Sequence, residues 1–210
     1  MKHLLVALMS GLISFSSSVV LAANHEKSAA VPIAIIGTGE VGSALGESWG
    51  RLGHPIIYGS RSPDSDKTRS LVSRSGDARA VPTADAAGFA DIVVLALPFA
   101  AALELLPRLD DLDGKILIDP MNALTFDRER RLVYQSDQRL AEQLQKLAPG
   151  AHVVKALNAV NASNMDPERR FEGPISIPVA GDDEKAKRVV IELITELRLH
   201  GQDVGPLFNA

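Results

Sequence analysis

The chain has 210 residues, of which 46% are hydrophobic and 23% are charged, and this composition predicts one soluble globular domain with a substantial core. The chain has 22 lysine and arginine residues and 26 aspartate and glutamate residues, which gives a formal net charge of −4. This charge excludes a strongly basic protein and argues against nucleic acid as a partner. The absence of cysteine excludes disulfides, iron–sulfur clusters and a thiol nucleophile. The five histidines include no pair at ligand spacing, so no metal site is expected.

The first 22 residues have the pattern of a secretory signal peptide. Lys2 gives a short positively charged start, an interrupted apolar run follows from Leu4 to Phe15, and the residues up to Ala22 offer a cleavage point. The apolar run is shorter than the roughly 20 residues of a membrane span, so no span is expected after cleavage; an uncleaved anchor is the alternative. Residues 23–30 are interpreted as a spacer and residues 31–210 as the domain, with a periplasmic or secreted location.

Short apolar runs alternate with amphipathic stretches along the domain. The predicted strands are, in chain order, 32–36, 55–58, 78–81, 91–97, 115–119, 152–156, 175–180 and the edge strand 202–204. The predicted helices are 41–52, 64–74, 83–89, 100–109, 137–147 and a last helix that starts at Asp182 or Asp183. Strands that are apolar throughout are buried on both faces, so the pattern predicts a single α/β domain with a doubly wound, mostly parallel sheet.

Residues 122–136 form the least regular stretch of the domain. They include the charge run from Asp127 to Arg131. A solvated loop or an exposed helix face is expected there, and a functional lid is the alternative.

The segment Gly37-Thr38-Gly39-Glu40-Val41-Gly42 matches the pattern G-x-G-x-x-G between a predicted strand and a predicted helix. In this context Gly37 allows the tight turn, Gly39 lets a pyrophosphate approach the backbone, and Gly42 permits close packing of the helix. The free N–H groups at the start of the helix attract phosphate. The motif predicts a dinucleotide site, and a glycine-rich turn without a ligand is the alternative.

The end of the second predicted strand indicates which dinucleotide is bound. A site for NAD usually places an acidic residue there to bind the ribose hydroxyls, whereas this chain has Ser60 and Arg61. A hydroxyl and a guanidinium would bind a 2′-phosphate. The sequence therefore favours NADP(H), with Arg61 as a plain surface cation as the alternative.

Other candidate residues follow the later strands, because ligands in such folds lie outside the carboxyl ends of the strands. Three asparagines could bond a carboxamide or an acceptor, or could simply form turns. Lys155 is the one nearby proton-donor candidate, and a surface position is the favoured interpretation of it. The residues singled out at these strand ends are Leu97, Pro98, Phe99, Asn122, Asn158 and Asn161.

Several ordered motifs resemble the NADPH-dependent coenzyme F420 reductase family, and the amino-terminal domains of six-transmembrane metalloreductases are similar. The motifs lie at residues 35–42, 58–61, 95–98, 153–158, 180–183 and 203–207, so the resemblance covers about residues 31–208. It implies a Rossmann-type domain that moves a hydride between NADP(H) and a flavin-like acceptor, with a deazaflavin such as coenzyme F420 or a flavin as second substrate.

The resemblance also implies roles for individual residues. Four residues would line the pyrophosphate, Ser60 and Arg61 would bind the 2′-phosphate, and four would touch the rest of the cofactor. The pyrophosphate set is Thr38, Gly39, Glu40 and Val41, and the remaining set is Phe99, Leu103, Asn122 and Ala156. Family members often carry a basic residue where Ser65 stands here, with Lys67 beyond it.

A small-molecule redox acceptor is the expected partner, and the oligomeric state, including a homodimer, is left open. No catalytic side chain is assigned, because hydride transfer between stacked rings needs alignment rather than an acid–base pair. Two alternatives remain. One is a reductase of a small carbonyl or imine, and the other is a non-catalytic NADP-binding module or subunit of a redox complex, which the short carboxyl terminus after Leu207 favours slightly.

Overall fold

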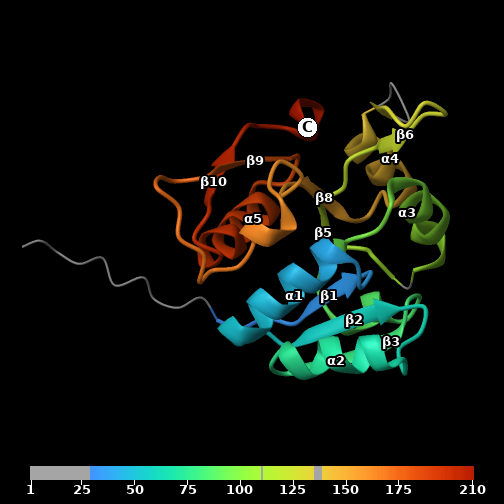
Figure 1. Ribbon diagram of the computed structural model, residues 1–210. Coiled ribbons are helices and arrows are strands. Elements are labelled where there is room, and N and C mark those ends of the chain that lie inside the picture. Colours follow the sequence, from blue (N-terminus) through green and yellow to red (C-terminus); the bar gives the residue numbers. More distant parts are fainter. Residues whose placement is uncertain (1–28, 110, 135–138) are drawn as a thin grey trace, which may run out of the picture.

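The computed structural model describes residues 29–109, 111–134 and 139–210 (Figure 1). The expected signal peptide over residues 1–22 and most of the expected spacer lie outside the described residues. Their boundaries therefore stay predictions.

An eight-stranded sheet forms the centre of the domain, in the order β10-β9-β8-β5-β4-β1-β2-β3. Neighbouring strands are parallel except β8 and β9, which pair antiparallel. The predicted mostly parallel sheet is confirmed, and β10 is the edge strand that was expected. The strands are β1 (Ile33–Ile36), β2 (Ile56–Ser60), β3 (Ala78–Pro82), β4 (Ile92–Leu95), β5 (Ile116–Asp119), β8 (His152–Lys155), β9 (Ser176–Gly181) and β10 (His200–Asp203).

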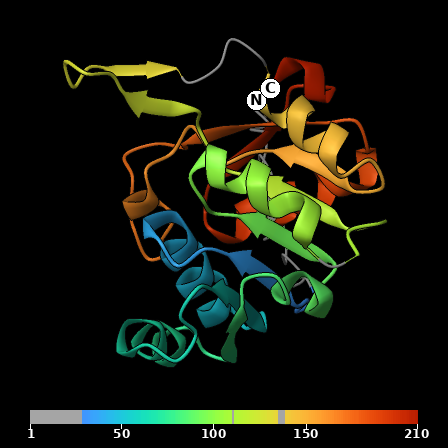
Figure 2. The same cartoon turned by 90° about the vertical axis from the view of Figure 1, so that its right-hand side faces the viewer.

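Helices cover both faces of this sheet, as a doubly wound fold requires (Figures 1 and 2). Buried residues of α1 (Glu40–Leu52), α2 (Asp66–Arg74) and α5 (Glu184–Glu196) belong to the core on one face. Those of α3 (Phe99–Leu105) and α4 (Leu140–Leu147) belong to the core on the other. The central strands β1 and β4 are buried along their whole length, which is why they read as unbroken apolar runs.

Short 3₁₀ helices replace parts of the predicted helices. The predicted helix 100–109 is α3 followed by η2 (Leu106–Arg108), because Pro107 has no N–H to continue the α-helical ladder. The predicted helix 83–89 is reduced to η1 (Ala86–Phe89), and α4 begins at Leu140, while residues 137 and 138 lie outside the described residues. Two further 3₁₀ turns are η3 (Ala162–Asn164) and η4 (Leu207–Asn209). Within the described part of the chain, every helix is too short or too polar to cross a membrane.

Within residues 122–136, the expected solvated loop is confirmed at the mostly exposed charge run from Asp127 to Arg131, whereas the segments on either side of it are strands that the sequence analysis did not predict. Strands β6 (Leu124–Phe126) and β7 (Leu132–Tyr134) form an antiparallel hairpin that extends from the body of the domain (Figure 2). The Asp127 carboxylate accepts hydrogen bonds from the backbone N–H and the guanidinium of Arg131, both at 2.8 Å, and so closes the turn. The charge run therefore forms the tip of a hairpin.

Candidate functional site

The glycine-rich turn joins β1 to α1 at the carboxyl edge of the sheet, and its three glycines have different surroundings. Gly37 has φ +113°, and a Cβ on it would lie 2.2 Å from the carbonyl oxygen of Ala96. A Cβ on Gly42 would lie 2.1 Å from the carbonyl oxygen of Gly37. A Cβ on Gly39 would meet no atom within 4 Å. The first and last glycines are therefore required by packing, whereas the middle one borders open space.

Two clefts flank this turn and share Gly39, Ala96 and Leu97 as walls. The first cleft has a volume of about 450 Å³ and opens toward β2, whereas the second has about 330 Å³ and opens toward the residues after β5. The first is lined by Gly37, Thr38, Gly39, Gly59, Ser60, Arg61, Lys67, Thr83, Ala96, Leu97, Pro98, Ala101 and Leu105. The second is lined by Gly39, Glu40, Val41, Ala96, Leu97, Pro120, Met121 and Asn122.

The far end of the first cleft is polar and positively charged. Ser60 ends β2 and is buried, and its Oγ accepts a hydrogen bond from the N–H of Ser62 at 3.1 Å. Ser65 caps α2 by accepting from the N–H of Thr68 at 3.2 Å, so the loop between β2 and α2 is ordered by its own hydroxyls. Arg61 and Lys67 are exposed, and among the described residues no carboxylate lies within ion-pair distance of either one.

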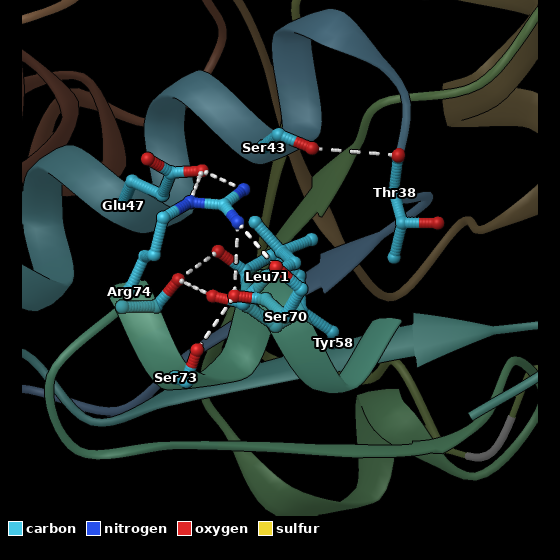
Figure 3. A network of polar contacts seen from close by, with 9 residues as sticks. Thr38, Ser43, Glu47, Tyr58, Ser70, Leu71, Ser73 and Arg74 are labelled. Atoms are coloured by element: carbon cyan, nitrogen blue, oxygen red, sulfur yellow. Dashed lines mark hydrogen bonds and ion pairs between the residues drawn. The ribbon is translucent and has the colours of Figure 1, made fainter. Parts of the chain in front are cut away.

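A network of polar contacts fixes α1 and α2 relative to the turn (Figure 3). Ser43 on α1 donates a hydrogen bond from its Oγ to the carbonyl oxygen of Thr38 at 3.4 Å. The guanidinium of Arg74 on α2 donates to Glu47 on α1, with an Nη2–Oε1 distance of 2.8 Å. Tyr58 on β2 lies beneath both helices, and burial raises the pKa of its hydroxyl to about 12. These contacts tie α1 to the glycine turn and α2 to α1.

The remaining predicted site residues divide between the clefts and the core. Leu97 and Pro98 line the first cleft, and Asn122 lines the second. Phe99 and Ala156 are buried at 4% and 0% exposure, and Leu103 packs against the core cluster that contains Phe99. The structure thus places the side chains of Phe99 and Ala156 in the core and leaves Leu103 half-buried against it.

Several residues that line the clefts were not singled out from the sequence. Lys67, noted in the sequence only as the lysine beyond Ser65, is the second residue of α2, and Thr83 follows the end of β3. The position of Thr83 after a strand was a usable signal, because ligands bind beyond the carboxyl ends of strands. Met121 lies between the predicted strand 115–119 and the irregular stretch 122–136, where no periodicity marks it.

The three candidate asparagines have separate roles. Asn161 caps η3, because its side chain accepts a hydrogen bond from the N–H of Ser163 at 3.0 Å. For this residue the structure therefore agrees with a turn-forming role. Asn122 and Asn158 face each other: the Nδ2 of Asn122 donates to the carbonyl oxygen of Asn158 at 2.9 Å, and their side chains approach to 3.4 Å. This contact bridges the chain after β5 and the chain after β8.

The expectation of a surface position for Lys155 is wrong. Lys155 ends β8 with 7% exposure, and its Nζ lies 3.0 Å from Oδ2 of the fully buried Asp119 at the end of β5. Burial raises the pKa of the Asp119 carboxyl above its ordinary value, and the nearby ammonium opposes that shift. The sequence could not show this pair, because the two residues are neighbours only through the register of β5 and β8.

Charge differs between the two clefts. The titratable side chains that line the first are the cations Arg61 and Lys67, whereas Glu40 lines the second. The first cleft therefore suits an anionic group. Among the described residues, no group of three histidine, aspartate or glutamate side chains is arranged to hold a metal ion.

Comparisons with a family model, a curated protein and a solved structure all point to the same family of proteins. A family model described as NADP oxidoreductase, coenzyme F420-dependent, matches residues 32–123. The F420-dependent NADP reductase of Methanocaldococcus jannaschii is 30% identical over 180 residues, which are 79% of each chain. The crystal structure of a protein assigned as an F420-dependent NADP reductase from Arthrobacter sp. FB24 superposes with a TM-score of 0.78 at 32% identity, covering 85% of this chain and 86% of that one.

A second relative is much longer than this chain. The metalloreductase STEAP3 of Rattus norvegicus is 28% identical over 178 residues, which are 85% of this chain and 34% of the rat protein. The chain therefore spans about a third of that relative's length.

Proposed function

The chain belongs to the F420-dependent NADP oxidoreductase family, and from this premise we propose that it transfers a hydride between NADP(H) and a deazaflavin or flavin-like acceptor. The observation that supports the proposal most is the pair of clefts on either side of a glycine turn whose middle residue borders open space. Such a turn can accept a pyrophosphate between two separate half-sites. The oxidoreductase class comes from the family, and the acceptor is the proposed part.

The pyrophosphate would lie against Gly39 and the first turn of α1. The space next to Gly39 is open, and the N–H groups at the start of α1 point toward it without a side-chain cap. These groups and the positive end of the helix dipole favour an anion. Thr38, Glu40 and Val41 would complete this contact.

The first cleft would hold the adenosine half with its 2′-phosphate. Ser60 Oγ, the Arg61 guanidinium and the Lys67 ammonium line one end of this cleft. The cations supply charge-assisted hydrogen bonds, and the hydroxyl-rich loop holds their backbone in place. Lys67 takes the role of the basic residue that Ser65 does not supply.

The second cleft would hold the nicotinamide end and the face of the acceptor. NADPH bound there would supply the reaction with a hydride, which carries two electrons; the acceptor would take this hydride and a proton from solvent, and NADP⁺ would be left. Val41, Leu97 and Met121 give this cleft an apolar wall that excludes water and supports a flat ring. The Nζ of Lys155 is hydrogen-bonded to Asp119 and to the Met121 carbonyl, and Lys155 lines neither cleft, so we do not assign it as the proton donor.

Steady-state kinetics with a panel of acceptors tests this proposal. NADPH oxidation is followed with a deazaflavin, FMN, a ferric chelate, and a small ketone and imine. The proposal expects a rate with the deazaflavin or the flavin at least tenfold above the others. NADPH binding without turnover on any acceptor would instead indicate a non-catalytic module, and turnover confined to the ketone or imine would indicate a carbonyl or imine reductase.

We also propose that the chain is exported and that cleavage occurs near Ala22. The charged start, the apolar run and the small residues before Ala23 support this proposal. Amino-terminal sequencing of the periplasmic or secreted protein is expected to begin close to Ala23. An intact Met1 in the cytoplasmic fraction would contradict export.

A further inference from the structure

Asp119 and Lys155 form a buried ion pair beside the second cleft. They are register partners at the last positions of the parallel strands β5 and β8, and their side chains are 0% and 9% exposed. Lys187, the other buried lysine among the described residues, pairs with Asp203 and Glu184, whose side chains are 40% and 68% exposed. Of these lysine pairs, only the one at the cleft removes both charges from water.

Both members of the pair also bind the backbone of Met121. Oδ1 of Asp119 accepts a hydrogen bond from the Met121 N–H at 2.9 Å, and Nζ of Lys155 donates to the Met121 carbonyl oxygen. The one N–H and the one carbonyl of this residue are thus both held by the pair. Pro120 lies between Asp119 and Met121, and its ring further restricts the chain. Met121 and Asn122 are wall residues of the second cleft.

A second contact fixes the same wall from outside. Asn122 donates to the carbonyl oxygen of Asn158, which follows β8. Between Lys155 and Asn158 the chain passes through Leu157, a buried non-glycine residue with φ +65°. A bulky side chain at positive φ is strained, and such strain persists only where surrounding contacts fix the backbone. The chain after β5 is therefore joined to the chain at and after β8 by two sets of contacts, one at Met121 and one at Asn122.

Stability alone is a poor reason for this arrangement. Taking two charges out of water costs about as much as their attraction returns, and apolar residues of similar volume often replace a buried pair with no loss of stability. The strands around the pair are otherwise apolar, with Leu117, Ile118, Val153 and Val154 buried. The pair differs from an apolar contact in that it holds the Met121 backbone in one position.

We propose that Asp119 and Lys155 are positioning residues that fix Met121 and Asn122 against the nicotinamide end of NADP(H). The inference rests on the proposed function, because it assigns the nicotinamide to the second cleft. Neither side chain lines the cleft, so both act through Met121. Misplacement of a reacting ring by about 1 Å costs roughly 100-fold in rate, so a wall that moves should lower kcat.

The double variant Asp119→Leu/Lys155→Met tests this inference, because it removes both charges and keeps an apolar filling. Lys187→Met is the matched control, because it removes a buried lysine that lines neither cleft and whose ion-pair partners are Glu184 and Asp203. Four quantities are measured on the full chain: the Kd of NADPH, the Kd of adenosine 2′,5′-bisphosphate, and the kcat and KM for NADPH oxidation. The bisphosphate occupies only the adenosine half and therefore reports on the first cleft.

The positioning role predicts at least a tenfold loss of kcat in the double variant, weaker NADPH binding, and an unchanged Kd for the bisphosphate. Lys187→Met should leave kcat and both Kd values unchanged. An unchanged kcat and NADPH affinity, or an equal loss of affinity for both ligands, would overturn the inference. Failure of the wild type to bind the bisphosphate would contradict the proposed function itself.

A milder variant keeps the test decisive if the double variant does not fold. Lys155→Gln removes the ammonium and shortens the side chain while retaining a hydrogen-bond donor. Hydrogen exchange of the Met121 amide should then accelerate at least tenfold relative to the wild type, with exchange in β1 unchanged. Equal Met121 exchange in Lys155→Gln and wild type would show that the pair does not hold the cleft wall.

Discussion

The two clefts are built in different ways. The glycine-turn side and the polar end of the first come from one local unit of the chain, namely the glycine turn, the end of β2 and the first turn of α2, and Thr83 with residues between Ala96 and Leu105 complete the lining. The wall of the second depends on contacts across 34 to 36 positions, between the chain after β5 and the chain at and after β8. Local motifs therefore specify nucleotide binding, whereas long-range pairing shapes the half that would meet the acceptor.

The largest effect is expected from a change at the junction of the two clefts. Gly39→Val would place a branched side chain in the space proposed for the pyrophosphate, where a Cβ meets no protein atom within 4 Å. NADPH affinity should fall about 5- to 150-fold because overpacking of this size costs about 1–3 kcal/mol. Fluorescence titration of NADPH gives the Kd, and circular dichroism should show an intact fold.

Gly173→Val is the matched control for this change, since a Cβ on Gly173 also meets no protein atom within 4 Å and Gly173 lines neither cleft. It should leave the Kd unchanged. Equal affinities of Gly39→Val and wild type would mean that the turn has only a structural role.

A smaller effect is expected at Lys67, which was missed as a site residue. Lys67→Ala should weaken NADPH binding about threefold to tenfold, because an exposed charge contact contributes roughly 1 kcal/mol and is screened by salt. NADH binding should not change. Lys185→Ala, an exposed lysine on α5, is the control. Isothermal titration at two salt concentrations measures the Kd of NADPH and of NADH for each variant. An equal loss of affinity for NADPH and NADH in Lys67→Ala would show that Lys67 does not bind the 2′-phosphate.

The scaffold of the first cleft can be examined without a ligand. Burial raises the pKa of Tyr58 from 10.0 to about 12, so the folded state keeps its proton where the unfolded state loses it. The stability linked to this proton is complete below pH 10 and declines as the pH rises through 12. In a Tyr134→Phe variant Tyr58 is the one remaining tyrosine. The midpoint of its ionisation, followed by ultraviolet absorbance, should lie at about pH 12. An ordinary midpoint in the folded protein would show that Tyr58 is solvated.

The contrast between the clefts also explains what the sequence could predict. The doubly wound sheet followed from unbroken apolar strands, and the glycine turn followed from its place between β1 and α1. The β6–β7 hairpin was missed because its strands are three residues each and its turn is a charge run. The Asp119–Lys155 pair was missed because only strand register brings the two residues together. Phe99 looked like a cleft residue after β4 but begins α3 and turns into the core.

The central claim is that Ser60 and Arg61 bind the 2′-phosphate of NADP(H). A set of dissociation constants for two cofactors and three forms of the protein tests it most directly. NADPH and NADH are titrated at fixed salt against the wild type, Arg61→Ala and Ser60→Asp. Hydrogen bonds to charged groups contribute roughly 1.5–3 kcal/mol, which corresponds to about 10- to 150-fold in affinity. The wild type should therefore prefer NADPH at least tenfold, Arg61→Ala should lose most of that preference with NADH unchanged, and Ser60→Asp should favour NADH. Equal weakening of both cofactors by Arg61→Ala would contradict the assignment to NADP(H).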